Sequence, residues 1–257
     1  MWKTEYAGTH DSIQVNGYSI SEKDCLGYFA TQVASKIAEA DGAENLRTHL
    51  AELETTGFDT SILHMQATES SMQLKDWEVG EAFAEKVLED EHEAMFPWET
   101  VWDKRTPRAS LPGADIVGFQ SKTAPRFIFG QVKSSSEKRV PPQNVNSGYD
   151  CLRQQMYSLS HLQPEQMQLI QWLLPRVRET NWENIFNDAL KKYAEKDFVL
   201  VGVMVSGGRD IDHKDLTDIC EGIQHTSSNG EMSLFGYYLP YDKKEWGNMV
   251  RGQGVQK

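Results

Sequence analysis

The sequence predicts an α/β protein in which a mixed β-sheet is flanked by helices. Two observations indicate this class. Stretches with apolar residues at three- and four-residue spacing alternate with short runs of β-branched and aromatic residues. The longest apolar run, Phe198–Val205, has the length of a strand and is typical of one covered on both faces. With 257 residues, the chain is long enough for one large domain or two small ones.

The first 70 residues are predicted to form a mainly helical N-terminal region. Ser21 is a candidate N-cap, with Asp24 three residues further on. The following helix has one apolar face, formed by Cys25, Tyr28, Phe29, Val33 and Ile37. Asp41-Gly42 should end this helix, a second one is expected over Glu44–Glu54, and a short strand is expected near Ser12–Val15. Residues 71–257 then form the second unit, unless the whole chain is one domain.

The second unit is expected to begin with a helix followed by a hairpin. Apolar spacing predicts a helix from Asp76 to about Asp90, and Trp98–Trp102 has the pattern of a strand. Two short apolar segments, Asp115–Phe119 and Arg126–Lys133, are separated by a turn-like sequence and predict paired strands. A loop over Ser134–Gly148 follows them.

Helical patterns dominate the remainder. They cover Asp150–Leu162, Glu165–Leu174 before Pro175, Trp182–Glu195 and Ile211–Ile223. The strand Phe198–Val205 lies between the last two of these. A final strand is expected over Leu234–Leu239, and Pro240 directly after it favours an edge position.

The charge distribution is uneven. The net charge of −12 argues against a passive nucleic-acid coat protein, because phosphate neutralisation requires basic surface. Residues 101–140, however, hold eight basic and three acidic residues, so this stretch carries +5 and the remainder −17. A positive region in an acidic chain favours an anionic substrate. The alternative is a solvated surface of strands and loops.

The compartment is expected to be the reducing cytosol. The N-terminus lacks the basic and apolar segments of a signal peptide, and no apolar run approaches the length of a membrane helix. The cysteines, Cys25, Cys151 and Cys220, are far apart in sequence and odd in number, so they indicate no disulfide framework.

The most informative residues are Asp115 on the first hairpin strand and Gln131-Val132-Lys133 on the second. Gln131 and Lys133 point to the same face of their strand, and the hairpin brings Asp115 beside them. A carboxylate, an amide oxygen and the backbone carbonyl of Val132 suit Mg²⁺ or Mn²⁺. Lys133 beside such an ion can orient water and stabilise charge on a phosphate. Alternatively, Asp115 shapes a turn and Lys133 is an exposed cation.

Glu81, on the preceding helix, can lean onto the same sheet edge and add a carboxylate to the metal site. With Glu81, Asp115, Gln131 and Lys133 in this order, residues 76–206 resemble the PD-(D/E)XK nuclease superfamily. The resemblance implies a restriction-endonuclease-like sheet, phosphodiester hydrolysis with Mg²⁺ or Mn²⁺, and Glu81, Asp115, Gln131 and Val132 at the metal.

Gln131 stands where most members of the superfamily have an acidic residue. Mrr-like restriction endonucleases also carry Gln-x-Lys, so the change does not imply inactivity, although it removes one negative charge. We therefore expect metal binding to depend more on Asp115 and Glu81. Contacts to nucleic-acid phosphates are expected from basic residues around the hairpin, namely Lys104, Arg105, Arg108, Lys138 and Arg139.

A narrower resemblance concerns bacterial defence. The Trp77-to-Glu81 helix start, the Pro112-Gly113-Ala114-Asp115 turn and the x-Lys-Ser motif are similar to those of HamA effectors of Hachiman antiphage systems. These work with a superfamily-2 helicase, HamB, so the resemblance implies an ATP-dependent helicase partner; Cap4-like effectors are related candidates. The resulting hypothesis is a DNA endonuclease that acts as a defence effector. The alternative is a catalytically inactive nuclease-like DNA-binding or regulatory subunit.

The other motifs in the sequence give weaker indications of function. The seven histidines form no H-E-x-x-H motif and are expected on the surface or in packing roles. His161, Arg153 and Gln154 follow the hairpin and can approach phosphate. Ser206-Gly207-Gly208-Arg209 lacks the end of a Walker motif and is read as a turn. The acidic run Glu89–Glu93 is expected to be solvated and available to a basic partner.

Overall fold

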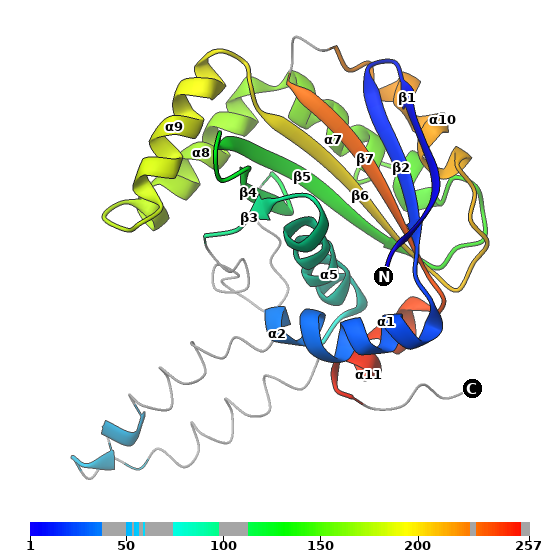
Figure 1. The fold of residues 1–257 in the computed structure, drawn as a ribbon, viewed down its shortest axis with the longest axis horizontal. Helices are drawn as coiled ribbons and strands as arrows, with labels where there is room; N and C mark the ends of the chain where they lie inside the picture. Colours follow the sequence, from blue (N-terminus) through cyan, green and yellow to red (C-terminus); the bar gives the residue numbers. More distant parts are fainter. Residues whose placement is uncertain are drawn as a thin grey trace.

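A mixed β-sheet forms the centre of the protein in the computed structural model, which describes residues 1–37, 50–52, 54–56, 59, 74–97, 113–226 and 230–252. Figure 1 shows the order of its seven strands, which is β1 (Lys3–His10), β2 (Ile13–Ser19), β7 (Glu231–Leu239), β6 (Val199–Gly207), β5 (Arg126–Ser135), β4 (Ile116–Gln120) and β3 (Ala94–Met95). The four central strands β2, β7, β6 and β5 are parallel. The outer pairs, β1–β2, β4–β5 and β3–β4, are antiparallel.

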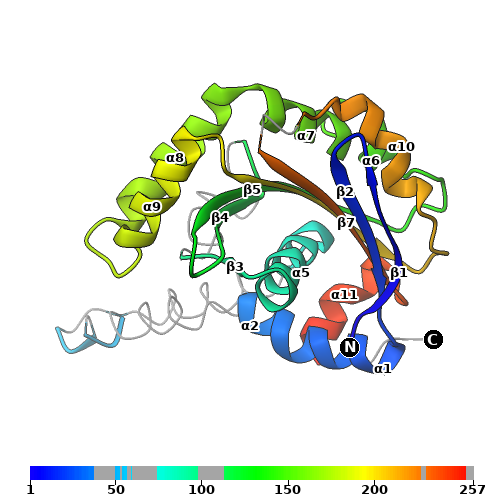
Figure 2. The same cartoon turned by 45° about the horizontal axis from the view of Figure 1, so that its top comes forward.

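Helices cover both faces of this sheet, as Figure 2 shows. One face packs against α1 (Glu22–Tyr28), the π-helical turn η1 (Phe29–Val33), α2 (Ala34–Ile37), α5 (Asp76–Glu91) and α11 (Lys243–Val250). The other packs against α6 (Gln143–Asn146), α7 (Leu152–His161), α8 (Gln163–Val177), α9 (Glu183–Ala194) and α10 (Lys214–Ile223). The predicted class, α/β with a mixed sheet flanked by helices, is confirmed.

Side chains along β5 alternate between the two cores. Phe127 and Phe129 belong to the core under α7–α10, whereas Ile128 and Val132 belong to the core under α5. Every residue of β6 is buried, as the apolar run predicted. Hydrophobic burial on both faces of β5 and β6 therefore fixes the part of the sheet that carries the hairpin.

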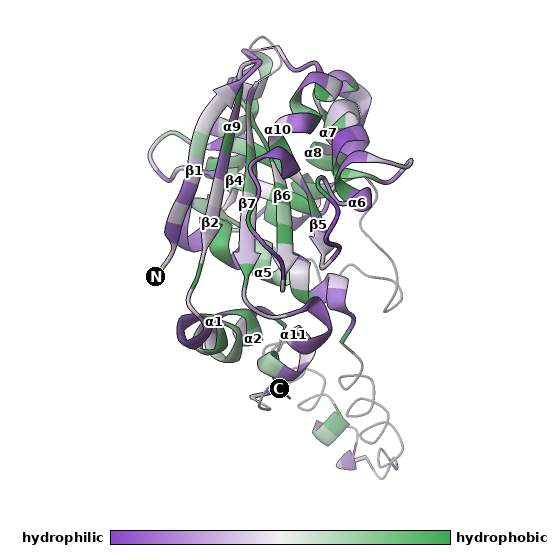
Figure 3. Cartoon of the chain, turned by 90° about the vertical axis from the view of Figure 1, so that its right-hand side faces the viewer, coloured by the Kyte–Doolittle hydropathy of each residue, from purple (hydrophilic) through white to green (hydrophobic). Residues whose placement is uncertain are grey.

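The N-terminal region differs from the sequence prediction. Residues 1–19 form the hairpin of β1 and β2, and β2 pairs with β7, so this segment extends the central sheet instead of forming part of a helical region. Alternate residues of β2, from Ile13 to Gly17, are buried, but this alternation is short. β1 is mostly hydrophilic (Figure 3) and exposed, so its composition gave little strand signal. The helix capped by Ser21 is confirmed, because the Ser21 hydroxyl accepts the Asp24 N–H at 3.2 Å.

Packing against glycine explains how β1 is held. A Cβ at Gly17 would overlap the ring of Tyr6, so only glycine lets this ring lie flat on β2. The Tyr6 hydroxyl lies 2.9 Å from that of Tyr238 on β7, which links the hairpin to the central strands.

The position of the last strand also differs from the prediction. β7 lies between β2 and β6, not at an edge, because the N-terminal hairpin adds to it. Pro240 follows the end of β7 and so breaks no strand pairing there. Pro175 does not end its helix before Val177. The helix α11 was not predicted, and the predicted segments Trp98–Trp102, Asp41-Gly42 and most of Glu44–Glu54 lie outside the described residues.

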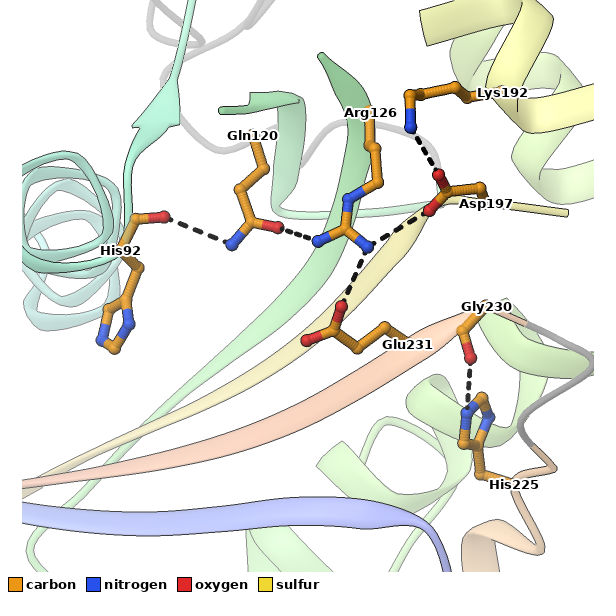
Figure 4. Close-up of polar contacts among 8 residues, drawn as sticks. All are labelled: His92, Gln120, Arg126, Lys192, Asp197, His225, Gly230 and Glu231. Atoms are coloured by element: carbon orange, nitrogen blue, oxygen red, sulfur yellow. Dashed lines mark hydrogen bonds and ion pairs between the residues drawn. The ribbon is translucent and has the colours of Figure 1, made fainter. Parts of the chain in front are cut away.

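A charged cluster ties together the amino-terminal ends of the parallel strands (Figure 4). Arg126 of β5 donates to Asp197 before β6 at 3.2 Å and to Glu231 of β7 at 2.9 Å. Its second nitrogen donates to Gln120 of β4 at 2.9 Å. Burial would raise the pKa of Asp197, but hydrogen bonds from Lys192 and Arg126 and their charges lower it overall. This end of the sheet is therefore fixed by one guanidinium group.

Across the described part of the chain, no helix is long and apolar enough to cross a membrane.

His92 makes the stability depend on pH. Its ring stacks on Phe235, with centroids 4.1 Å apart, and its Nε2 lies 2.8 Å from the Tyr237 hydroxyl. Burial lowers the pKa of His92 from 6.5 to about 4. The unfolded chain therefore binds more protons than the folded protein between these values, and stability must fall as pH decreases through this window.

We expect the free energy of unfolding to decrease by about 2–3 kcal/mol between pH 7 and pH 4 through this group alone. Urea unfolding of wild type and His92→Phe across this range measures the effect. The variant keeps a ring on Phe235 and should show a flatter pH dependence, whereas His161→Gln, at an exposed position, should follow wild type. Equal slopes in wild type and His92→Phe would contradict this assignment.

Candidate active site

Hydrogen bonds to β5 hold Asp115 in place. Its backbone N–H donates to the Gly130 carbonyl at 3.0 Å, and its carboxylate accepts the Val132 N–H at 2.8 Å. Asp115 directly precedes β4, so the predicted hairpin brings it beside the Gln131–Lys133 segment. The carboxylate is therefore fixed against the β5 backbone, and Asp115 does more than shape a turn.

Gly80 brings α5 close to β5. A Cβ at Gly80 would overlap the Ser134 hydroxyl in its present rotamer, so a larger residue would require that hydroxyl to turn away. The indole of Trp246 on α11 packs at the same point, 3.6 Å from that Cβ position. Glu81 is the next residue of the helix, and the close approach places its side chain at the carboxyl end of β5.

One cavity, of about 740 Å³, gathers most of the predicted residues. Glu81 from α5, Asp115 before β4, and Val132 and Lys133 from β5 line it together. Asn144, Gln155, Lys75 and Lys243 also line this cavity, and sequence analysis did not single them out. The two amides lie in the helical segments after the hairpin, and Lys243 comes from α11, so no local motif marks them.

Gln131 is not among the residues that line the cavity. It is 4% exposed, and its side-chain N–H donates to the Gly113 carbonyl at 2.8 Å. The side-chain amide thus fastens the turn that precedes Asp115. Its expected role as a metal ligand is not supported by this geometry, and it holds the Asp115 segment instead.

The donor set of the cavity fits a divalent cation that retains much of its water shell. Glu81 and Asp115 supply the two predicted carboxylates, and Val132 supplies a backbone carbonyl. Asp76 and Asp150 add two further carboxylates to the lining. The buried amide oxygens of Asn144 and Gln155 have no hydrogen-bond partner among the described residues. Such acceptors cost about 1–3 kcal/mol when unsatisfied, which favours entry of a donor or a cation. Within the described ranges, no group of three His, Cys, Asp or Glu residues can hold a metal by itself.

Burial shifts the pKa values of several tyrosines outside this cavity. The pKa values of Tyr238 and Tyr237 are raised chiefly by burial. Neither residue lines the cavity. The candidate site is defined by the convergence of side chains from separate elements.

The predicted phosphate-binding residues are only partly described. Lys138 and Arg139 are exposed in the loop after β5 and do not line the cavity, and Lys104, Arg105 and Arg108 lie outside the described residues. Arg153 packs against Gly222 of α10, and the ring of His161 stacks on Tyr157. Gln155 lines the cavity, whereas its neighbour Gln154 does not.

Comparison with known proteins provides no family for this chain: neither a family model nor a curated protein matches it.

Substitution of Gln131 tests whether a cation binds near Asp115 without an assay of catalysis. In Gln131→Glu, a carboxylate would face the Gly113 carbonyl in place of an N–H donor. We expect a loss of about 1–3 kcal/mol of stability in EDTA, because a buried acceptor loses its donor. If a cation binds near Asp115, Mg²⁺ should stabilise this variant more than wild type, since the added negative charge lies close to the cation. Thermal unfolding in EDTA and in Mg²⁺ measures both effects.

Gln120→Glu is the matched control. Gln120 also donates from its amide to a backbone carbonyl, that of His92 at 3.2 Å, but it lies at the opposite end of the sheet. Its substitution should change stability equally with and without Mg²⁺. A Gln131→Glu variant whose response to Mg²⁺ equals that of wild type would argue against a cation near Asp115.

Proposed function

We propose that this protein is a divalent-metal-dependent DNA endonuclease of the PD-(D/E)XK type. The observation that supports this function best is the convergence of Glu81, Asp115 and Lys133 on one cavity from three different elements. The order α5, β4, β5, α7, β6 agrees with the restriction-endonuclease-like core that the resemblance implies. Phosphodiester hydrolysis requires carboxylates, a cationic group and space for a phosphate, and this cavity offers all three.

The residues have distinct roles in this proposal. Mg²⁺ or Mn²⁺, when bound, supplies positive charge that offsets the charge developing on the scissile phosphate. Glu81, Asp115 and the Val132 carbonyl are the groups that would hold it. The Lys133 ammonium group orients the attacking water and stabilises the charged phosphate oxygens. The Val132 N–H fixes the Asp115 carboxylate, so this ligand is positioned before substrate arrives.

We further propose that the protein is the effector subunit of a bacterial antiphage defence complex with an ATP-dependent helicase, as the resemblance to HamA effectors implies. The net charge of −12 supports a partner, because an acidic protein approaches DNA poorly by itself. The acidic run Glu89–Glu93 is partly paired within the protein, while Glu91 and Glu93 are exposed. Glu89 lies 2.5 Å from the Lys36 ammonium, and Lys86 pairs with Asp90.

A specific observation favours the alternative function, that of a catalytically inactive nuclease-like DNA-binding or regulatory subunit. Gln131 is a neutral amide whose N–H donates to the Gly113 carbonyl, so the position that is acidic in the usual acidic-x-Lys motif supplies no carboxylate. Weak cation binding would leave a site that contacts phosphate without cleaving it. Cleavage assays separate the two functions.

We expect Lys133→Ala and Asp115→Asn each to reduce cleavage of plasmid DNA by at least about 100-fold in Mg²⁺ or Mn²⁺, the scale of a lost catalytic group. Asn at position 115 keeps an oxygen that accepts the Val132 N–H, so folding should be preserved, as circular dichroism would verify. Lys191→Ala, an exposed lysine on α9, is the control. Wild-type rates in both folded site variants would refute the site, and wild-type protein that never cleaves would favour the alternative.

A further inference from the structure

A second cavity, of about 670 Å³, adjoins the candidate active site. Four residues line both cavities, namely Ser134, Asn144, Asp150 and Lys243, so the two form one continuous groove. The second cavity lies between the end of β5, the turn before α7 and the start of α11. A chain bound at the candidate site can therefore continue into it.

Tyr149 lines this second cavity and is 89% exposed. Gly148 precedes it with a φ of +102°, a conformation that glycine adopts readily, and the Cys151 N–H donates to the Gly148 carbonyl at 3.4 Å. The turn thus presents a large aromatic ring to solvent at the rim of the groove. Aromatic rings of this kind stack on unpaired bases, at about 1–3 kcal/mol for each base.

Other residues that line this cavity carry hydroxyl and ammonium groups, which are suited to binding phosphate. The hydroxyls of Ser135 and Ser136 accept the backbone N–H groups of Glu137 and Lys243, at 3.1 and 2.9 Å. A hydroxyl group that accepts a hydrogen bond still has its own hydrogen to donate. Lys243 and Lys244 add two ammonium groups at the start of α11.

Three carboxylates also line this cavity, and two of them cap backbone groups. Glu137 accepts the Gln143 N–H at 2.6 Å, and Asp242 accepts the Lys244 N–H at 3.0 Å. Asp150, next to Tyr149, keeps a negative charge in the groove. Phosphate is therefore favoured at the lysine end, and a base is favoured at the tyrosine end.

We propose that this second cavity binds the nucleotide next to the scissile phosphate of a single-stranded DNA segment, with Tyr149 stacked on its base and Lys243 and Lys244 on its phosphate. The inference rests on the proposed nuclease function and defines its substrate as an unpaired strand. In a duplex, both faces of an internal base are covered by its neighbours, so Tyr149 would have no face to contact.

Binding of fluorescein-labelled oligonucleotides in EDTA, followed by anisotropy, tests this proposal. We expect Tyr149→Ala to weaken single-stranded DNA binding by about five- to a hundred-fold. Tyr149→Phe keeps the ring and should stay within about twofold, and binding of a duplex of equal length should not depend on Tyr149. The Lys243→Ala, Lys244→Ala double variant should reduce the slope of log affinity against log salt by about 1.4, whereas Lys191→Ala should not.

The outcomes separate this proposal from the nuclease assignment. Tyr149→Ala protein that binds single strands like wild type would overturn the groove proposal, as would equal losses on duplex and single strand, or a preference for RNA over DNA. Lys133-dependent cleavage would in that case leave the nuclease function standing. Tyr149-dependent single-strand binding without any cation-dependent cleavage would support the groove and refute the nuclease.

Discussion

The contact between Gly80 and Ser134 decides where the candidate site lies. Because residue 80 has no side chain, α5 can approach the end of β5 until it meets the Ser134 hydroxyl. Glu81 then reaches the cavity that Asp115 and Lys133 enter from the hairpin. A methyl group at residue 80 would meet the Ser134 hydroxyl and the Trp246 indole, so the close packing of α5 on β5 depends on the absent side chain together with the rotamer of Ser134.

Polar side chains are paired differently at the two ends of the sheet. At the amino-terminal ends of β5, β6 and β7, Arg126 is bonded to two carboxylates and an amide, so its charge is compensated. At the carboxyl-terminal ends, buried amide oxygens of Asn144 and Gln155 have no partner in the described part of the chain. Compensated charges stabilise a fold, whereas unsatisfied acceptors cost free energy until a ligand reaches them. Compensated charge is not confined to the amino-terminal end, because Arg209, which follows β6, is bonded to the buried Asp215 at 3.0 Å.

Sequence patterns predicted the elements that depend on burial alone. Local side-chain chemistry predicts the apolar run of β6, the spacing of apolar residues in α5 and the turn between β4 and β5. The structure contains all three. The central place of β7 depends instead on its pairing with β2, between residues that are more than 200 positions apart. Pro240 after β7 suggested an edge, but a proline beyond a strand does not prevent a neighbour from pairing with the strand itself.

The residues of the candidate site were likewise only partly predictable from the sequence. Asp115 and Lys133 were predicted because the hairpin brings them together, and Glu81 because the preceding helix can reach the same end of the sheet; all three line the cavity. Gln131 has the correct alternation for a ligand, but its amide meets the Gly113 carbonyl, a contact that depends on the shape of the turn. Tyr149 and Lys243 belong to a turn and a short helix that come near the hairpin only in the folded chain. Residues that complete a groove from separate segments become visible only when their positions in space are known.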